Sequence, residues 1–420
     1  MSVMPQTRER IRGEGAAFVN AVATTPTCCP SRASLMSGLY AHNHGVFHNQ
    51  NNESELAQLD VDRLIAHQLS EAGYRTGLVG KFLNGWDLNA APPDFDRYVM
   101  SPGGFFDSRW NINGQERLVH RYSTGFVGRQ AQQFIEESEQ DDERPWFLYV
   151  APFAPHGTLN GGQVTLEPHP RYADTDVGEM GANPAREETS PAAIADKPPF
   201  WRNLVAGYEP GSGAPSAAEV YVGQRRMLLS VDDMIEGLFR RLDDSRESRR
   251  TLAVFVSDNG LFWGEHGGPP IKDMPYPAAV DIPLMMRWPG VIEAGVRDDR
   301  IAATIDLAPT LLDAANVAPA EAMDGRSLLR RWPREHVLLE YERTGQIPSW
   351  GSLYSPDEQQ YSEYYSPSGA PMFREFYDFA ADPFGLENVI VDGNPANDPN
   401  LVALSASLAA ARVCAGASCP

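Results

Sequence analysis

Long apolar runs are absent from this sequence. No stretch of about 18 consecutive apolar residues occurs, so the sequence predicts no membrane span. The first twenty residues also lack the apolar core of a secretory signal, so we expect no signal peptide in the chain as given. With 22% charged and 42% hydrophobic residues, the composition is that of an ordinary globular protein.

Basic residues are scarce relative to acidic ones. The sequence holds 35 Lys and Arg against 56 Asp and Glu, which gives a formal net charge of -21. Binding to a nucleic-acid backbone requires a basic stripe, and none is visible, so nucleic acid is excluded as a partner. An anionic substrate would have to be attracted by a local positive pocket against the overall field.

Cysteine is also scarce, and the four cysteines form two pairs at opposite ends of the chain. Cys28 and Cys29 are adjacent, and their diverging side chains are poorly placed to bridge each other. No second Cys or His pair stands nearby at ligand spacing, which argues against zinc. Cys414 and Cys419 predict a small disulfide loop suited to an oxidising compartment, with two free thiols as the alternative.

The order of apolar segments predicts an α/β fold, in which a mostly parallel sheet is sandwiched by helices. Expected helices are 61–72, 126–137, 220–242 and one that begins at Asp306; expected strands are 76–79, 146–150, 252–256 and 283–286. The Gly- and Pro-rich stretch 160–215 reads as a long surface excursion.

The composition and the pattern of apolar residues change after residue 332. A strand at 337–341, a Tyr- and Ser-rich stretch and an Ala-rich helix at 401–413 follow. The length of 420 residues suits two domains, or one large domain with an appendage. We therefore expect a catalytic domain over 1–332 and a small α+β subdomain over 333–420.

Polar residues follow three of the predicted strands, where the site of a parallel sheet collects. Lys81 follows 76–79, His156 follows 146–150, and Asp258 with Asn259 follows 252–256. Carboxylate and amide oxygens suit Ca²⁺ or Mg²⁺. Each residue alone has an ordinary interpretation as a solvated lysine, a surface histidine or a turn.

The run Cys28-Cys29-Pro30-Ser31-Arg32 predicts a helix start, whose positive end favours an anion. It also resembles the signature of the formylglycine-dependent sulfatases, in the alkaline phosphatase superfamily. The resemblance implies that a formylglycine-generating enzyme oxidises Cys28 to formylglycine, whose hydrate attacks sulfur. It further implies hydrolysis of a sulfated sugar or aryl sulfate with the help of Ca²⁺ or Mg²⁺.

Further matches extend the resemblance over most of the chain. They include Gly80–Asn84, Ala41–His44, 229–233, Gly264–Gly267 and Tyr377-Asp378. Leu83 stands where many arylsulfatases have His, as in the glucosamine-6-sulfatase branch, so the sequence is most similar to N-acetylglucosamine-6-sulfatases and bacterial arylsulfatases. The implied catalytic residues are Cys28, Arg32, Lys81, His156 and Lys272; the substrate-binding residues are His44, Asn84 and His266; the metal ligands are Asp258, Asn259 and Cys28.

The sequence departs from the family pattern at its start. Family members begin with a central strand that ends in Asp-Asp and supplies two metal ligands, whereas no Asp occurs here before Asp60. We expect the first central strand to be missing, and the full-length form to be secreted or periplasmic. Two other functions stay open: a metal-deficient, non-catalytic protein that binds anions or glycans, and a phosphomonoester or phosphonate hydrolase of the same superfamily.

Overall fold

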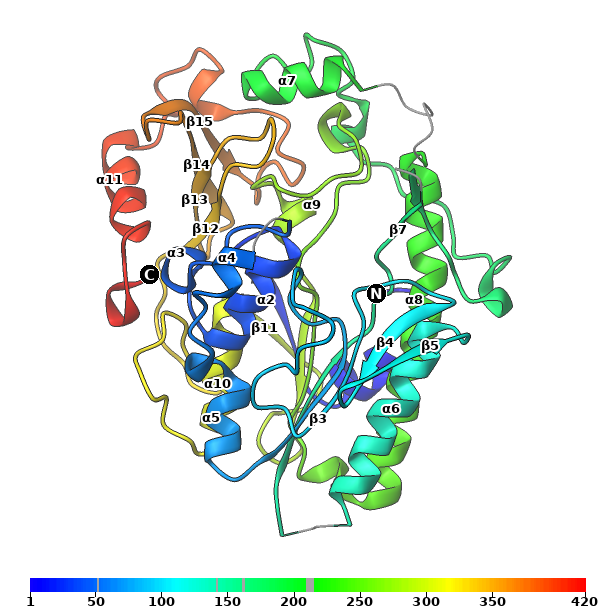
Figure 1. Ribbon diagram of the computed structural model, residues 1–420. Coiled ribbons are helices and arrows are strands. Elements are labelled where there is room, and N and C mark those ends of the chain that lie inside the picture. The colour runs from blue at the N-terminus through cyan, green and yellow to red at the C-terminus, as the bar shows by residue number, and fades with distance from the viewer. Residues whose placement is uncertain (51–52, 141–142, 161–162, 209–214) are drawn as a thin grey trace.

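The computed structural model describes residues 1–50, 53–140, 143–160, 163–208 and 215–420. Two sheets form its central layer (Figure 1). The first has the order β11-β1-β10-β9, with β1 Ala16–Val22, β9 Ala253–Val256, β10 Leu284–Arg287 and β11 Val296–Ala303. The second has the order β5-β4-β3-β2-β6, with β2 Arg75–Gly80, β3 Arg97–Met100, β4 Ser108–Ile112, β5 Gln115–Val119 and β6 Trp146–Ala151.

Helices cover both faces of this layer, as predicted. One face packs against α2 Cys28–Ser37, α5 Ile65–Glu71 and α10 Leu307–Ala314, and the other against α6 Ser123–Ser138 and α8 Ala217–Ser245. The expected helix 61–72 is divided into a 3₁₀ turn, Val61–Arg63, and α5, because Leu64 between them is extended. A capping box between Ser216 and Glu219 starts α8 three residues before the predicted position.

The α/β class is confirmed, but the layer is less parallel than expected. β2 runs parallel to β3 and β6, and β1 runs parallel to β11, whereas β10, β4 and β5 form antiparallel pairs. The β4–β5 hairpin turns at Asn113-Gly114, both with positive φ. That pair is a strong hairpin signal, which the sequence interpretation did not use.

The layer is interrupted between β6 and β9. Alternate residues of both strands pack into the same two cores, with Phe147 and Val254 on one face and Leu148 and Phe255 on the other. Among the described residues, neither strand has a ladder partner on its second edge. The two sheets are thus halves of one layer, as expected for a fold without its first central strand.

The C-terminal part forms an antiparallel sheet of β12 Val337–Tyr341, β13 Trp350–Tyr354, β14 Gln359–Tyr365 and β15 Pro371–Asp378, beside helix α11 Leu401–Ala411 (Figure 1). The Cys414–Cys419 disulfide is present, as predicted. This sheet shares a buried cluster with Val22, Tyr40 and Tyr276 of the larger part. The division at residue 332 stays a prediction.

The expected excursion 160–215 is mostly irregular. It begins within the hairpin of β7 Thr158–Asn160 and β8 Gln163–Thr165 and contains 3₁₀ turns at Pro170–Tyr172 and Pro184–Glu187, and α7 Pro199–Ala206. Positions 161–162 and 209–214 of this prediction lie outside the described residues. The remaining short segments are α1 Pro5–Thr7, the π-helical Arg8–Gly13, α3 Ala41–His44, α4 Glu53–Leu56, α9 Pro277–Val280 and 3₁₀ turns at Glu247–Arg249, Glu265–Gly267, Thr304–Asp306, Val389–Val391 and Gly416–Ser418.

Candidate active site

Cys28 is the first residue of α2, which follows β1. Thr27 before it is extended, and Gly38 in the left-handed conformation ends the helix. The whole helix is buried, and Cys28 is 2% exposed. The predicted helix start is therefore confirmed, and the sulfur lies where the positive end of the helix dipole favours an anion.

Three cationic side chains surround Cys28. The Lys272 ammonium donates to Cys28 Sγ at 3.0 Å and to Asn259 Oδ1 at 3.2 Å. Arg32 donates from Nε to Asp258 Oδ2 at 2.8 Å, and from Nη1 to the carbonyl oxygens of Lys81 and Phe82. Lys81 is 7% exposed, and burial together with the nearby guanidinium lowers its pKa.

The electrostatics of the pocket are set by these cations. Burial raises the pKa of the Cys28 thiol, but the ammonium groups of Lys272 and Lys81 outweigh burial and lower it to about 5. Burial likewise opposes ionisation of Asp258, but Arg32 and the two lysines hold the pKa of this carboxyl well below its usual range. Cationic side chains thus gather around Cys28 in a chain of net charge -21.

Lysine is rare enough in this chain to have been a signal. Only Lys81, Lys197 and Lys272 occur, and two of the three lie at Cys28. The third is fully buried elsewhere, where its ammonium donates to Asp196 and to the carbonyl of Leu386. The sequence interpretation did not use this scarcity.

His156 lies at the exposed mouth of the pocket. It follows β6 beyond the cis Ala154–Pro155 bond, and its Nδ1 is 2.6 Å from the carbonyl oxygen of Gly157. It also lies within hydrogen-bonding reach of Cys28. The structure thus brings His156 together with Cys28, Arg32, Lys81, Asp258, Asn259 and Lys272 at the ends of β2, β6 and β9, as the strand-end argument predicts.

His44, Asn84 and His266 are held by contacts within the protein. His44 is 6% exposed, its Nε2 is 3.0 Å from Ser34 Oγ, and its Nδ1 accepts from the Val46 amide. The Asn84 carbonyl accepts from the Cys29 thiol. His266 is 2% exposed and its Nδ1 is 2.6 Å from Glu188. The contacts of the two histidine rings favour structural roles, whereas that of Asn84 involves only its backbone; direct binding of substrate by these three residues stays a prediction.

Sequence reasoning missed the residues that hold the segment around Cys28 in place. Ser31 Oγ donates to the Asp258 carbonyl, the Cys29 amide donates to Asn49 Oδ1, and Thr27 Oγ1 donates to Asp273 Oδ1. Ser31 stands inside the signature run and Asp273 directly follows Lys272, so both could have been singled out by position.

The residues present do not make a divalent-cation site. Among the described residues, no group of three or more His, Cys, Asp or Glu could hold a metal ion. The Asp258 carboxylate faces Arg32, and the Asn259 amide oxygen accepts from Lys272. Calcium takes about 6 to 8 oxygens, so these two residues fall well short of a coordination shell.

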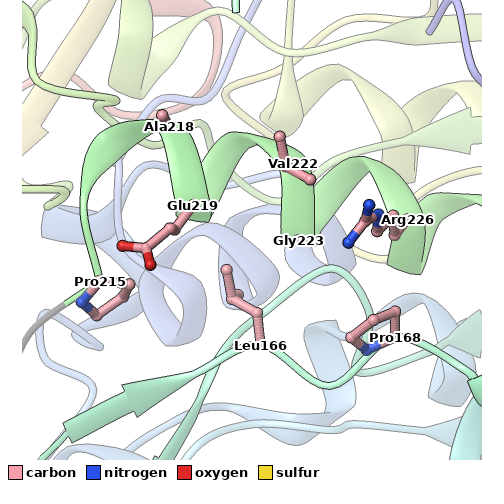
Figure 2. A pocket seen from close by; sticks show the side chains of 8 residues that line it. All are labelled: Leu166, Pro168, Pro215, Ala218, Glu219, Val222, Gly223 and Arg226. Atoms are coloured by element: carbon pink, nitrogen blue, oxygen red, sulfur yellow. The ribbon is translucent and has the colours of Figure 1, made fainter. Parts of the chain in front are cut away.

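A separate open pocket of about 490 Å³ lies beside the start of α8 (Figure 2). Leu166 and Pro168 line it from the segment that faces the helix, and Val222, Glu219 and Arg226 line it from the helix. None of the residues assembled around Cys28 lines it. In the described part of the chain, no helix is both long and apolar enough to cross a membrane.

Comparison with known proteins assigns the class. Residues 1–317 match the sulfatase family, and residues 264–411 match the C-terminal region of N-sulphoglucosamine sulphohydrolase. The chain belongs to the sulfatase family, whose named members among its relatives are hydrolases of sulfate esters.

Two relatives show which sulfatases the chain is similar to. A putative extracellular sulfatase Sulf-1 homolog of Caenorhabditis elegans is 32% identical over 340 residues, which cover 78% of this chain and 46% of the relative. The N-acetylglucosamine-6-sulfatase of Homo sapiens is 27% identical over 380 residues, 82% of this chain and 65% of the relative. The chain thus spans less than two thirds of the length of either protein. The similarity to N-acetylglucosamine-6-sulfatases and arylsulfatases is confirmed.

A solved structure shows the same fold. A protein in complex with its substrate D-glucosamine-2-N,6-O-disulfate superposes with a TM-score of 0.74 at 22% identity, over 97% of this chain and 92% of the other. The α/β layer with its helices and the C-terminal sheet therefore belong to a fold shared with sulfatase structures.

Proposed function

We propose that this chain hydrolyses sulfate esters of sugars or aryl alcohols with a nucleophile derived from Cys28. The observation that carries the proposal is the contact of Lys272 with Cys28 at the start of α2. The positive charges of Lys81 and Arg32 lie near the same sulfur. Three cations around one nucleophile match the three oxygens of a sulfate group. An unmodified thiol that attacked sulfur would have no second group on the same carbon to expel the sulfate. A modified residue is therefore part of the proposal.

A formylglycine at position 28 would carry, as its hydrate, two hydroxyls on one carbon. One would attack sulfur and hold the sulfate covalently as the alcohol leaves; loss of the other's proton would then expel sulfate and regenerate the aldehyde. In the unmodified chain, Cys28 Sγ stands in for the attacking oxygen. Lys272, 3.0 Å from this position, would stabilise its ionised form, and Lys81 would share the negative charge of the sulfate. Arg32 adds positive charge and fixes Asp258. No step is assigned to a divalent cation, because the described residues do not hold one.

His156 would serve as the general acid. It is exposed at the mouth of the pocket and within reach of Cys28, so it can face the leaving alcohol while the sulfate lies deeper. Its proton would pass to the ester oxygen as the bond to sulfur breaks.

The names of the relatives support sulfated amino sugars as the substrates of this chain. The human relative is named for N-acetylglucosamine 6-sulfate, and the structural neighbour binds a disulfated glucosamine. Leu83 also stands where that branch differs from many arylsulfatases. The extracellular naming of the Sulf-1 relatives and the Cys414–Cys419 disulfide support action outside the cytoplasm.

The test is co-expression with a formylglycine-generating enzyme, followed by peptide mass spectrometry of position 28. We expect conversion of Cys28, retention of Cys29, and sulfate release from N-acetylglucosamine 6-sulfate and nitrophenyl sulfate above that from nitrophenyl phosphate. Full activity with an unmodified Cys28 thiol would overturn the mechanism. Preference for the phosphate ester would assign the chain to the phosphoester hydrolases of the superfamily.

A sulfate-binding protein without turnover is the second candidate. It is favoured by Asp258 and Asn259, whose oxygens already bind Arg32 and Lys272 rather than a metal. Calorimetry with glucosamine 6-sulfate, run beside the release assay on the converted protein, separates the candidates. Binding without release supports the second, and release supports the first.

A further inference from the structure

The segment Lys272–Tyr276, here termed the Lys272 loop, is held by the C-terminal sheet. Three consecutive strands of that sheet each contribute one side chain to it. The contacts are Trp350 Nε1 in β13 to the Asp273 carbonyl at 2.9 Å, Gln360 Nε2 in β14 to the Pro275 carbonyl at 2.6 Å, and Tyr276 Oη to Glu375 Oε1 in β15 at 2.7 Å. The sheet thus fixes the loop at three points.

The three side chains that hold the loop are buried. Trp350 and Gln360 are 1% exposed, and Glu375 is fully buried. Tyr276 belongs to the same hydrophobic cluster as Trp350. Hydrogen bonds in such an environment are not exchanged for bonds to water, so the loop has few alternative positions.

Asp273 ties the same loop to the nucleophile. Its Oδ1 accepts from Thr27 Oγ1 at 3.0 Å, and Thr27 directly precedes Cys28. Asp273 also has φ of +74°, in the left-handed region that L residues other than Gly rarely occupy. Such a conformation persists where the surroundings impose it, and here the carbonyl is held by Trp350 and the carboxylate by Thr27.

Lys272 needs this support because its side chain is long. A lysine loses much rotamer freedom when its ammonium is held at one point, so a fixed backbone lowers the cost of keeping it there. Its Nζ reaches both Cys28 and Asn259, which lie on different segments. A small shift of the loop would remove one or both contacts.

We infer that the C-terminal sheet positions Lys272 against residue 28, with Trp350 as the principal positioning residue. The inference rests on the proposed function only for the catalytic role of Lys272. It gives the sheet a task in the site although none of its own side chains contacts Cys28 in the described structure.

The experiment measures alkylation of the unmodified Cys28 thiol by iodoacetamide at pH 7, followed by peptide mass spectrometry. This readout does not need sulfatase activity, so its failure and that of the proposed function are distinguishable. The ammonium of Lys272 favours the reactive thiolate, so Trp350→Phe should slow alkylation by about threefold or more. Tyr276→Phe, which removes only the hydroxyl bonded to Glu375, should slow it less and is the milder second variant.

Two controls separate positioning from general loosening. Tyr365→Phe removes a buried hydroxyl bonded to Glu363 on the same sheet, away from the Lys272 loop, and should leave the rate unchanged. In a Lys272→Met background, Trp350→Phe should have no further effect, since a residue that acts through Lys272 is not additive with its loss. Unchanged alkylation in Trp350→Phe, faster alkylation, or equal slowing in both backgrounds would overturn the inference.

Discussion

The candidate site has two sides: the three cations around Cys28, here called the sulfate side, and the oxygens of Asp258 and Asn259. The two differ in whether their polar groups are available to a ligand. On the sulfate side, Lys272, Lys81 and Arg32 surround the start of α2, and each is anchored by neighbouring segments. On the other side, the carboxylate of Asp258 and the amide oxygen of Asn259 already accept hydrogen bonds from Arg32 and Lys272. Loops and a helix start are therefore enough to gather three cations around Cys28, whereas the oxygens of these two residues are engaged by those cations and not by a metal.

The strongest test of the sulfate side is removal of its nucleophile. Cys28→Ala should lower sulfatase turnover by at least about 1000-fold, because it removes the side chain that Lys272 contacts and that the proposal makes the source of the nucleophile. Cys28→Ser should accept sulfate and stall, since one hydroxyl can attack but cannot eliminate. Intact-protein mass spectrometry detects the sulfated serine. Cys29→Ala is the matched control and should keep most activity, and rapid turnover by Cys28→Ser would point to another nucleophile.

Removal of a single cation should have the next largest effect. Lys272→Met is expected to reduce kcat/KM for nitrophenyl sulfate by about 100-fold, because the charge that stabilises the nucleophile is lost. Lys81→Met should act similarly, whereas Arg226→Met, in the separate pocket beside α8, should change kcat/KM less than twofold. A drop of equal size in Arg226→Met would place the substrate elsewhere.

The side formed by Asp258 and Asn259 can be tested by measuring the stability of a variant at Asp258. Asp258→Asn removes the partner of Arg32, whose side chain is 9% exposed, and should lower the free energy of unfolding by about 2 to 3 kcal/mol. Asp313→Asn, which breaks a pair with the mostly exposed Arg330, should cost less than about 1 kcal/mol. Urea denaturation measures both. Equal losses would show that Arg32 does not depend on Asp258.

The overall charge predicts a preference between substrates. A net charge of -21 repels an extended polyanion outside the pocket, so a sulfated monosaccharide should be cleaved several-fold faster than long heparin at low ionic strength. Added salt should narrow the difference by screening. Faster cleavage of long heparin at low salt would contradict this expectation.

Calcium should have the smallest effect. Because no group of three or more acidic, His or Cys side chains among the described residues could hold a metal ion, calorimetry with Ca²⁺ on this chain should show no binding tighter than about millimolar, and chelation should leave the melting temperature unchanged. Tight binding would mean that other oxygens in this sequence complete a shell, and the account of this side of the site would be wrong.

The part of the fold that the sequence predicted is the part encoded by local pattern. β2, β6, β9 and β10 are short apolar runs, and α6 and α8 show helical periodicity, so their positions follow from neighbouring residues. β11 holds four consecutive charged residues, 297–300, so its composition does not mark it as a strand. β1 pairs with strands more than 260 residues away, so its partners cannot be read from the local pattern. The strands after residue 341 were seen only as a Tyr- and Ser-rich stretch.

The site was predictable to a similar extent. Lys81, His156 and Asp258 each follow a recognisable strand, so the rule of strand ends brings them together. Asp273 and Trp350 could not be found in this way, because their contact joins a loop to a sheet 77 residues further along the chain. His266 carried a motif signal, yet its ring is bound to Glu188 from the irregular excursion, which no local pattern reveals.

The scarcity of lysine also has a spectroscopic consequence. Metabolic labelling with ¹⁵N-lysine would place only three side-chain ammonium groups in a nitrogen spectrum, those of Lys81, Lys197 and Lys272. Two of them face residue 28, and the third is buried against Asp196 and should report only the integrity of the fold. The chain therefore contains both a reporter of anion binding and its own internal reference, without any introduced label.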